Sequence, residues 1–420
     1  MATLDDLIKK LPPETREIFQ MVWETLSPDD RTVLQTLLGG LPPNAVLSRL
    51  LLRLSTQQLR MAFGQKQSIA ILGPTNVGKS TLYNQFAQNK TDRAEVSPLP
   101  GTTRTNQEAD AGVFSIVDTP GADAIGEVGE REQQVALDAA ARADFLIILF
   151  DAIQGIKQTE LDLFNQLVGL GKPYVVALNK IDMVRRDKDL IVQHAAESLN
   201  LTVDQIIPIA AKTGEGLPQI LAAVVALEPG ILAALGRGMP QYRWQLAWRS
   251  IVSSATVSAV IALTPIPIID FAPLLITQSV MVLGIARVYN YRITLARARE
   301  LVATFGLGFL GRTLFYELSK FGGVPGWILA AAVASSTTVV MGYAAAIWFE
   351  RGEKLSTETL NKLTRQISAA LMSSLKDLGK RKPGKKRLQD RITQALDESD
   401  MAVDRKILDQ QVQDEHPETD

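Results

Sequence analysis

The sequence predicts an α/β fold in which helices cover both faces of a mostly parallel sheet, flanked by N-terminal helices and a C-terminal hydrophobic all-α region. Three observations predict this architecture. Compact apolar runs alternate with helical patterns over residues 65–228, as in parallel sheets that are buried on both faces. Residues 1–64 form helix-like stretches punctuated by prolines. Residues 240–350 form a hydrophobic helical segment, and residues 351–420 form a charged tail with a helical pattern.

Short apolar runs supply the expected strands of the sheet. They are Ser68–Leu72, Val113–Val117, Phe145–Phe150, Tyr174–Leu178 and Ile206–Ile209. Ligands of such sheets bind at the carboxyl ends of the strands. We therefore expect the polar motifs that follow these runs to lie together.

Composition excludes several classes of protein. A chain of 420 residues has room for two or three domains, and its net charge of −1 shows neither a nucleic-acid-binding bias nor disorder. The chain has no cysteine, which excludes disulfides, and its two histidines, His194 and His416, are too far apart for a metal cluster. The N-terminus has no apolar segment typical of a secretory signal, so we expect the α/β part to stay in the cytoplasm.

The stretch Gly73–Ser80, GPTNVGKS, follows an expected strand and opens an expected helix. It fits the pattern G-x-x-x-x-G-K-[ST], in which backbone N–H groups and the positive end of a helix bind phosphates. In this pattern Gly78 leaves room for the phosphates, Lys79 reaches the β- and γ-phosphates, and the Ser80 hydroxyl ligates Mg²⁺. The unit of strand, turn and helix indicates a P-loop NTPase fold.

A second motif, Asn179–Asp182 with the sequence NKID, directly follows another apolar run. A carboxylate at Asp182 can accept two N–H bonds from the edge of guanine, which adenine cannot offer in the same geometry. We expect Asn179 to brace the neighbouring loops and Lys180 to lie along the base. The motif therefore predicts selection of guanine over adenine.

These two motifs and three others, in the expected order, resemble the guanine-nucleotide-binding domain of the TrmE/Era group of P-loop GTPases. The five boxes that carry the resemblance are Gly73–Ser80, Pro100–Arg104 (PGTTR), Asp118–Gly121 (DTPG), Asn179–Asp182 and Ile209–Lys212 (IAAK). The fifth box has Ala210 where the group usually has serine, which removes a supporting hydroxyl and keeps the backbone contact.

The resemblance implies that the chain binds GTP and GDP together with Mg²⁺. The magnesium ligands would be Ser80, Thr103 (or its neighbour Thr102) and Asp118, the last through water. The catalytic residues would be Lys79, Thr103 and Gly121, whose N–H would touch the γ-phosphate. The Ala211 N–H would meet the guanine oxygen. The nucleotide-contacting positions would be Gly73, Asn76, Val77, Gly78, Lys79, Ser80, Thr81, Asn179, Lys180, Asp182, Ala210, Ala211 and Lys212.

One departure concerns the attacking water. Ala122 stands where many GTPases carry a glutamine that orients this water, so we expect slow intrinsic turnover. The TrmE/Era group shares this lack, and some of its members use a potassium ion held near an asparagine at the position of Asn76. Glu127 and Glu130, which we expect in a loop, are alternative water-positioning groups.

Two stretches of the hydrophobic segment are almost free of charge. Between residues 250 and 286 the only charged residue is Asp270, and residues 321–349 carry none. About 20 apolar residues suffice to span a bilayer. Pro265 and Pro267 break the first stretch into two short arms typical of a hairpin, and arginines on both of its flanks place both ends in the cytoplasm.

Residues 240–350 are also similar to the YcjF-like domain of unknown function, which is often fused to such GTPases and thought to associate with membranes. We therefore expect residues 250–349 to bind membrane lipid, with a soluble helical core or a self-association surface as the alternative. A single pass at residues 321–349 would export the basic run Lys380–Arg387, so this stretch is expected to fold back or stay buried. The basic run itself fits anionic lipid, RNA phosphates or plain solvation.

The leading hypothesis is a GTP-hydrolysing switch associated with a membrane and acting on a protein effector or on a second copy. The alternatives are a soluble GTPase in RNA or ribosome assembly and a nucleotide-locked scaffold that hardly turns over. Because no compact basic module accompanies residues 65–228, nucleic acid is not the expected partner.

Overall fold

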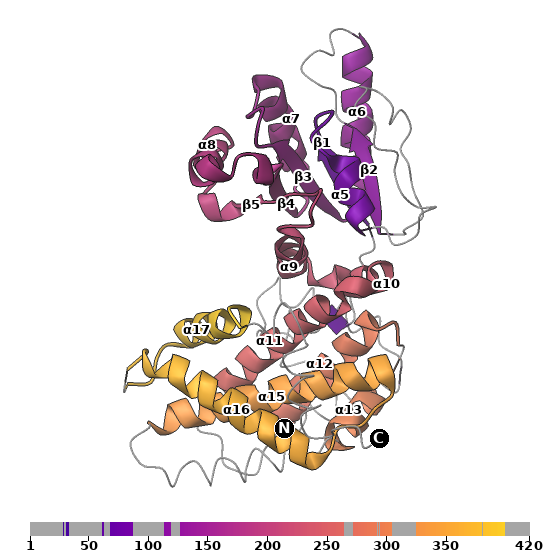
Figure 1. Cartoon of the computed structure of the whole chain (residues 1–420). Coiled ribbons are helices and arrows are strands. Elements are labelled where there is room, and N and C mark those ends of the chain that lie inside the picture. The colour runs from indigo at the N-terminus through magenta and orange to yellow at the C-terminus, as the bar shows by residue number, and fades with distance from the viewer. Residues whose placement is uncertain are drawn as a thin grey trace, which may run out of the picture. The chain divides into compact units, whose positions relative to one another are not determined.

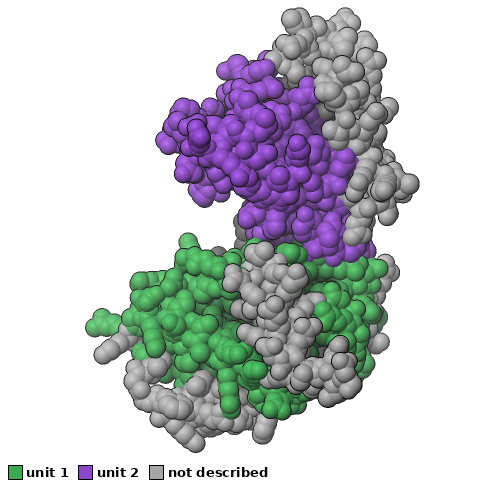
Figure 2. All heavy atoms as spheres, in the orientation of Figure 1, with its two compact units in different colours: residues 1–64, 243–420 green, residues 65–242 purple. Residues whose placement is uncertain are grey.

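The computed structural model divides the chain into two compact units, residues 65–242 and residues 243–420 with residues 1–64 (Figure 2). The structure describes residues 28, 31, 32, 61, 62, 68–86, 113–118, 127–263, 272–291, 293, 295–304, 325–379 and 381–399. The helices expected in residues 1–64 lie almost wholly outside the described residues. The expected division into four domains stays a prediction.

Within the described residues, the first unit contains a five-stranded parallel sheet with the strand order β2-β1-β3-β4-β5 (Figure 1). The strands are β1 (Ile69–Gly73), β2 (Phe114–Asp118), β3 (Phe145–Asp151), β4 (Tyr174–Asn179) and β5 (Ile206–Pro208). The predicted parallel sheet is confirmed. The first four strands each run at least one residue past the apolar run, because backbone pairing continues into the polar residues that follow.

Helices cover the sheet on both faces. They are α5 (Lys79–Phe86), α6 (Glu127–Arg142), α7 (Gln158–Gly169), α8 (Lys188–Ser198) and α9 (Leu217–Leu227). The short helix α10 (Leu232–Gly238) follows α9 in the chain. Short 3₁₀ turns occupy Ile181–Met183, Arg185–Asp187, Val203–Gln205, Pro229–Ile231 and Pro240–Tyr242.

The side chains of the strands alternate between two apolar layers. Leu72, Ile148 and Leu178 belong to the cluster that α6, α7 and α8 complete on one face. Neighbouring strand residues face the opposite side, where the rings of Phe86 on α5 and Phe114 on β2 stack with centroids 4.7 Å apart. The sheet is therefore buried on both faces, and its carboxyl edge is left for the polar motifs.

The second unit is helical in its described residues. Its helices are α11 (Arg243–Ala262), α12 (Ala272–Val288), α13 (Leu295–Thr304), α15 (Gly326–Arg351), α16 (Thr357–Lys376) and α17 (Lys385–Asp397). The two expected hairpin arms correspond to α11 and α12, which contact each other. Pro265, Pro267 and Asp270 lie outside the described residues.

Helix α15 lies against α11, α12 and α16 (Figure 1). Among the described residues it is the one continuous helix long and apolar enough to cross a bilayer, with a mean hydropathy of 1.6. However, 94% of its apolar window is buried inside the structure, and the core helix of a soluble bundle has the same composition. A β-carbon added at Gly342 would lie 2.4 Å from Ile251 Cγ1, so α15 approaches α11 closely there.

Hydroxyl groups in the middle of α15 bond to its neighbours. Ser335 Oγ donates to the Ala255 carbonyl oxygen of α11 at 3.0 Å, and Thr338 Oγ1 donates to Ser258 Oγ at 2.9 Å. Ser336 Oγ lies 2.5 Å from Ser368 Oγ of α16. These polar groups are therefore satisfied by protein partners, as buried polar groups require.

Helices α16 and α17 come from the expected charged tail and pack on the apolar helices. Both are amphipathic, and the buried residues of α16 include Leu360, Leu363, Ile367, Leu371 and Leu375. The Arg249 guanidinium of α11 pairs with the Asp397 carboxylate of α17 at 3.0 Å. Lys382, from the basic run, donates to the Leu263 carbonyl oxygen beyond α11.

Candidate functional site

The loop Gly73–Ser80 joins the end of β1 to the start of α5, as the first motif predicts. Two of its glycines have positive φ, 153° at Gly73 and 99° at Gly78. A β-carbon at Gly73 would lie 2.2 Å from the Leu149 carbonyl oxygen, and one at Gly78 would lie 2.3 Å from Asn179 Nδ2. Both positions therefore need glycine for space as well as for conformation.

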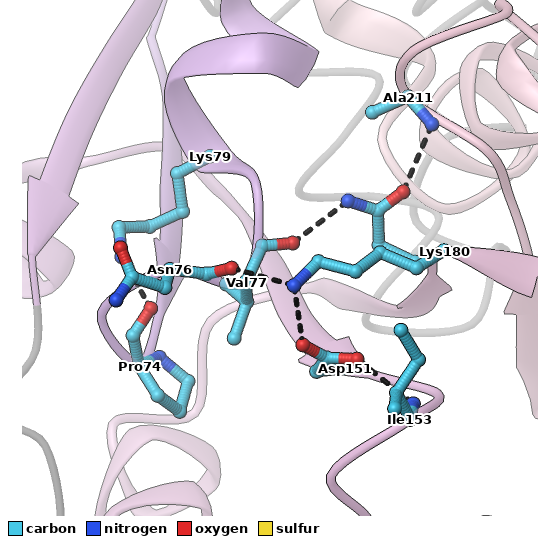
Figure 3. Close-up of polar contacts among 9 residues, drawn as sticks. Pro74, Asn76, Val77, Lys79, Asp151, Ile153, Lys180 and Ala211 are labelled. Carbon is cyan, nitrogen blue, oxygen red and sulfur yellow. Dashed lines mark hydrogen bonds and ion pairs between the residues drawn. The ribbon is translucent and has the colours of Figure 1, made fainter. Parts of the chain in front are cut away.

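Lys79 is the buried cation of this loop, with 4% of its surface exposed. Its Nζ donates to the carbonyl oxygens of Gly73 and Pro74, both at 2.6 Å. Figure 3 shows the bond to Pro74. The ammonium is thus held across the loop whose backbone N–H groups would bind phosphate. Ser80, the next residue, is half-buried at the start of α5.

Asn179 connects three loops at the carboxyl edge of the sheet. Its side chain is buried, its Nδ2 donates to the Val77 carbonyl oxygen at 2.7 Å, and its Oδ1 accepts from the Ala211 N–H at 2.9 Å (Figure 3). The structure thus brings together the first, fourth and fifth boxes, with Asn179 in the bracing position expected of it. Because Ala211 N–H is bonded to Asn179 in this structure, its contact with guanine stays a prediction.

Lys180 takes the left-handed conformation, with φ of 66°, directly after β4. Its Nζ donates to the Asn76 carbonyl oxygen at 2.9 Å and to Asp151 Oδ2 at 2.6 Å. Asp151 is a partner of the site that the motifs did not predict. A carboxylate directly after the apolar run Phe145–Phe150 was the available signal, because it ends a strand beside Asn179.

Asp182, the expected guanine selector, lies half-buried on the turn Ile181–Met183. The turn is fixed by the Ile181 N–H, which donates to the Ile209 carbonyl oxygen at 3.1 Å. Within the part of the chain that the structure describes, the Asp182 carboxylate has no hydrogen-bond or ion-pair partner. It is thus available to accept two N–H bonds.

The remaining expected positions are placed in part. Asp118 ends β2 and pairs with Gly73 across the ladder, which puts its backbone beside the phosphate loop. Thr102, Thr103, Gly121 and Ala122 lie outside the described residues. Glu127 and Glu130, expected in a loop, instead belong to the first turns of α6, so the loop expectation is wrong.

The fifth box follows β5. The Ala210 N–H bonds to the Glu215 carbonyl oxygen at 3.0 Å, which closes a tight loop. Lys212 has an exposed side chain, and its carbonyl oxygen accepts from Gln85 Nε2 of α5 at 3.2 Å. This bond adds a further connection between the fifth box and the helix of the phosphate loop.

Among the described carboxyl groups, Glu160 on α7 has a pKa raised above its ordinary value. Burial raises its pKa above 4.5, and the negative charge of Asp151 adds to the shift. The backbone N–H of Lys157, which donates to Glu160 Oε2 at 3.3 Å, acts in the opposite direction. This group lies on the flank of the site and caps α7.

Two family models match separate parts of the chain. Residues 68–180 match the family described as "50S ribosome-binding GTPase", and residues 242–377 match "Domain of unknown function (DUF697)". The second match includes α16, so it reaches beyond the expected domain end at residue 350.

The chain is also similar to curated GTPase Der proteins. It is 34% identical over 163 residues to that of Glaesserella parasuis and 35% identical over 167 residues to that of Solidesulfovibrio magneticus. Each match covers 38% of this chain, and the chain spans 31% and 36% of the length of these relatives.

Among solved structures, the chain is similar to a probable GTP-binding protein engB, at 23% identity and a TM-score of 0.30 over 38% of this chain and 97% of the other. It is also similar to Aquifex aeolicus Era bound to GDP and aluminium fluoride, at 24% identity and a TM-score of 0.34 over 50% of this chain and 70% of the other.

Proposed function

We propose that the first unit binds GTP and GDP with Mg²⁺ and hydrolyses GTP to GDP and phosphate. One observation carries this proposal: the Asn179 side chain bonds to both the phosphate loop and the fifth box, and the neighbouring Asp182 carboxylate has no described partner. This arrangement puts the loop Gly73–Ser80 and a carboxylate able to accept two N–H bonds at the same edge of one sheet, which supports the proposal. The match to a GTPase family over residues 68–180 supports it.

The expected ligands fit a magnesium ion that binds together with the nucleotide. Mg²⁺ prefers oxygen ligands and is bound through one or two carboxylates together with substrate phosphates and waters. Ser80 supplies one hydroxyl at the start of α5. Asp118, whose backbone pairs with Gly73, would add a carboxylate, and Thr103 would add a second hydroxyl. Among the described residues, no group of three or more acidic or histidine side chains could hold a metal by itself. When bound, the ion would neutralise charge on the β- and γ-phosphates.

The chemistry rests on positioning. Lys79 would bind the β- and γ-phosphates, and the Gly121 N–H would touch the γ-phosphate, so that loss of this group releases the loop around Thr103. Because Ala122 cannot orient water, turnover is slow. We propose that a potassium ion near Asn76 raises it, which a comparison of hydrolysis rates in potassium and sodium chloride would test.

A nucleotide competition assay tests the binding proposal. Fluorescent GDP is displaced from the full-length chain by GTP, GDP, ATP or xanthosine diphosphate. GTP and GDP are expected to compete far better than ATP, because Asp182 reads the guanine edge. If ATP displaces fluorescent GDP as well as GTP does, the chain does not select guanine and this part of the proposal is wrong.

We further propose that the second unit associates the chain with a membrane and that nucleotide state alters this association. The length and hydropathy of α15 and the apolar arms α11 and α12 support the proposal. The alternative role is a helical core that stays out of the bilayer or joins two copies. The 94% burial of the apolar window of α15 is also compatible with this alternative, whereas its hydroxyl bonds to α11 and α16 suit a helix bundle in either setting.

Fractionation of cells separates these roles. A chain inserted in a membrane stays in the pellet after washes with high salt and with carbonate, and a deletion of residues 250–349 is expected to release a soluble GTP-binding fragment. A chain that salt alone extracts is not inserted. Copurification with RNA that survives high salt would instead revive the RNA-assembly alternative.

A further inference from the structure

The buried carboxylate of Asp151 has a role that the five boxes do not assign. Asp151 ends β3, pairs with Asn179 of β4 across the ladder, and is only 3% exposed. Burial of a charged carboxylate is costly unless partners compensate for the lost water. The partners of Asp151 therefore indicate what the residue does.

Both oxygens of this carboxylate are bonded. Oδ1 accepts from the Ile153 N–H at 2.8 Å, which fixes the carboxylate plane through the turn after β3. Oδ2 accepts from Lys180 Nζ at 2.6 Å, a charge-assisted bond. The carboxylate thus holds a cation at a position set by the sheet.

Lys180 continues the connection to the phosphate loop. Its Nζ makes a second bond, to the Asn76 carbonyl oxygen at 2.9 Å, so one ammonium lies between Asp151 and the loop (Figure 3). The Lys180 side chain therefore stretches from the guanine-selecting loop to the phosphate-binding loop. In that extended position its stem can lie along a bound base.

We propose that Asp151 is a positioning residue that holds Lys180 in this extended position and thereby slows the release of guanine nucleotide. The inference rests on the proposed function of the first unit. In this role Asp151 acts through the Lys180 ammonium. An asparagine at this position would keep the bond from the Ile153 N–H through its Oδ1. Its NH₂ group would face the Lys180 ammonium, and because both groups are donors, only the bond to Lys180 would be lost.

The test measures dissociation of fluorescent GDP from the full-length chain and its Asp151→Asn, Lys180→Met and doubly substituted variants. Loss of one charge-assisted bond is expected to speed release about tenfold in each single variant. The double variant is expected to release GDP no faster than Lys180→Met alone, because both substitutions break one connection. Lys180→Arg, which keeps a cation for Asp151, is expected to restore most of the slow release.

Asp162→Asn is the matched control, because Asp162 is an exposed carboxylate on α7 that bonds to Gln158 at 2.9 Å. It should release GDP at the wild-type rate. Unchanged release from Asp151→Asn, or fully additive effects in the double variant, would overturn the inference. So would a lower melting temperature of Asp151→Asn with wild-type release, which is the signature of fold support alone.

Lys180→Met tests the inference even if Asp151→Asn fails to fold. If the Lys180→Met variant releases GDP at the wild-type rate, the bonds of Lys180 do not slow release and the inference is wrong. If the wild-type chain does not bind GDP at all, the proposed function is wrong. If the wild-type chain binds GDP and the variants release it at the same rate, only the inference about Asp151 is wrong.

Discussion

Replacement of Asn179 with alanine removes the side chain that joins three loops of the first unit. Asn179 is 3% exposed, and its amide makes one bond to the Val77 carbonyl oxygen and one to the Ala211 N–H. Both partners are themselves buried, at 3% and 1% exposure, so water cannot readily replace the lost amide. The substitution therefore leaves one acceptor and one donor unpaired inside the unit.

The expected loss follows from these two bonds. A buried hydrogen bond contributes about 1 kcal/mol net, and a buried polar group left unpaired costs about 1–3 kcal/mol. With partial relaxation around the two groups, we expect the free energy of unfolding of the first unit to fall by about 3 kcal/mol. Because domains unfold at about 5–15 kcal/mol, this is a large share of the total.

Urea unfolding of the full-length chain provides the assay. The tryptophans are Trp23, Trp244, Trp248, Trp327 and Trp348, so residues 65–242 contain none. Tryptophan fluorescence therefore reports on the second unit and the N-terminal segment, and far-ultraviolet circular dichroism reports on both units. The Asn179→Ala variant should show an earlier circular-dichroism transition and an unshifted fluorescence transition.

The control is Asn165→Ala, which removes an exposed amide from α7. It should change stability by less than about 0.5 kcal/mol, as expected of surface substitutions. A shift of less than about 1 kcal/mol for Asn179→Ala would refute the assignment of two buried bonds to this side chain.

The remaining predictions concern base recognition, phosphate binding, pH and helix packing. Asp182→Asn should move nucleotide preference toward xanthine nucleotides in the competition assay, because the donor and acceptor pattern is swapped. Lys79→Ala should abolish GTP hydrolysis in a phosphate-release assay and leave the helical circular-dichroism signal intact. Burial raises the pKa of Glu160 above 4.5, so in the pH range just above 4.5 the folded chain keeps a proton that the unfolded chain loses. The free energy of unfolding should therefore fall as the pH rises from 4.5 to the pKa of Glu160 in the folded chain. Glu160→Gln should flatten that pH dependence in urea unfolding. Gly342→Leu should lower the melting temperature of the second unit by several degrees, because a β-carbon there would meet Ile251 at 2.4 Å.

The apolar runs and the first motif made the sheet and its phosphate loop predictable. A run such as Phe145–Phe150 is short for a buried helix and rich in aromatic and β-branched residues, so it favours a strand covered on both faces. The same holds for Gly73–Ser80, whose glycines and lysine are required by backbone geometry and by phosphate charge. The role of Asn179 in bracing the loops followed from its place after a strand.

Other features depended on residues far apart in the chain. Asp151 and Lys180 are 29 positions apart, and their ion pair exists because β3 and β4 are neighbours in the sheet. The sequence also could not predict the partner of the Ala211 N–H. A backbone N–H that bonds to Asn179 and one that bonds to guanine have the same sequence pattern.

By itself the sequence determined the strands, the phosphate loop, the guanine-selecting motif and the apolar character of α15. The tertiary structure decided what each of these groups touches. Helix α15 shows the difference, because apolar residues favour lipid and a protein core alike, and hydropathy measures only that they avoid water. The bonds of Ser335, Ser336 and Thr338 to α11 and α16 distinguish a protein neighbour from lipid, since only protein can supply those partners, and they form only when the helices are packed together.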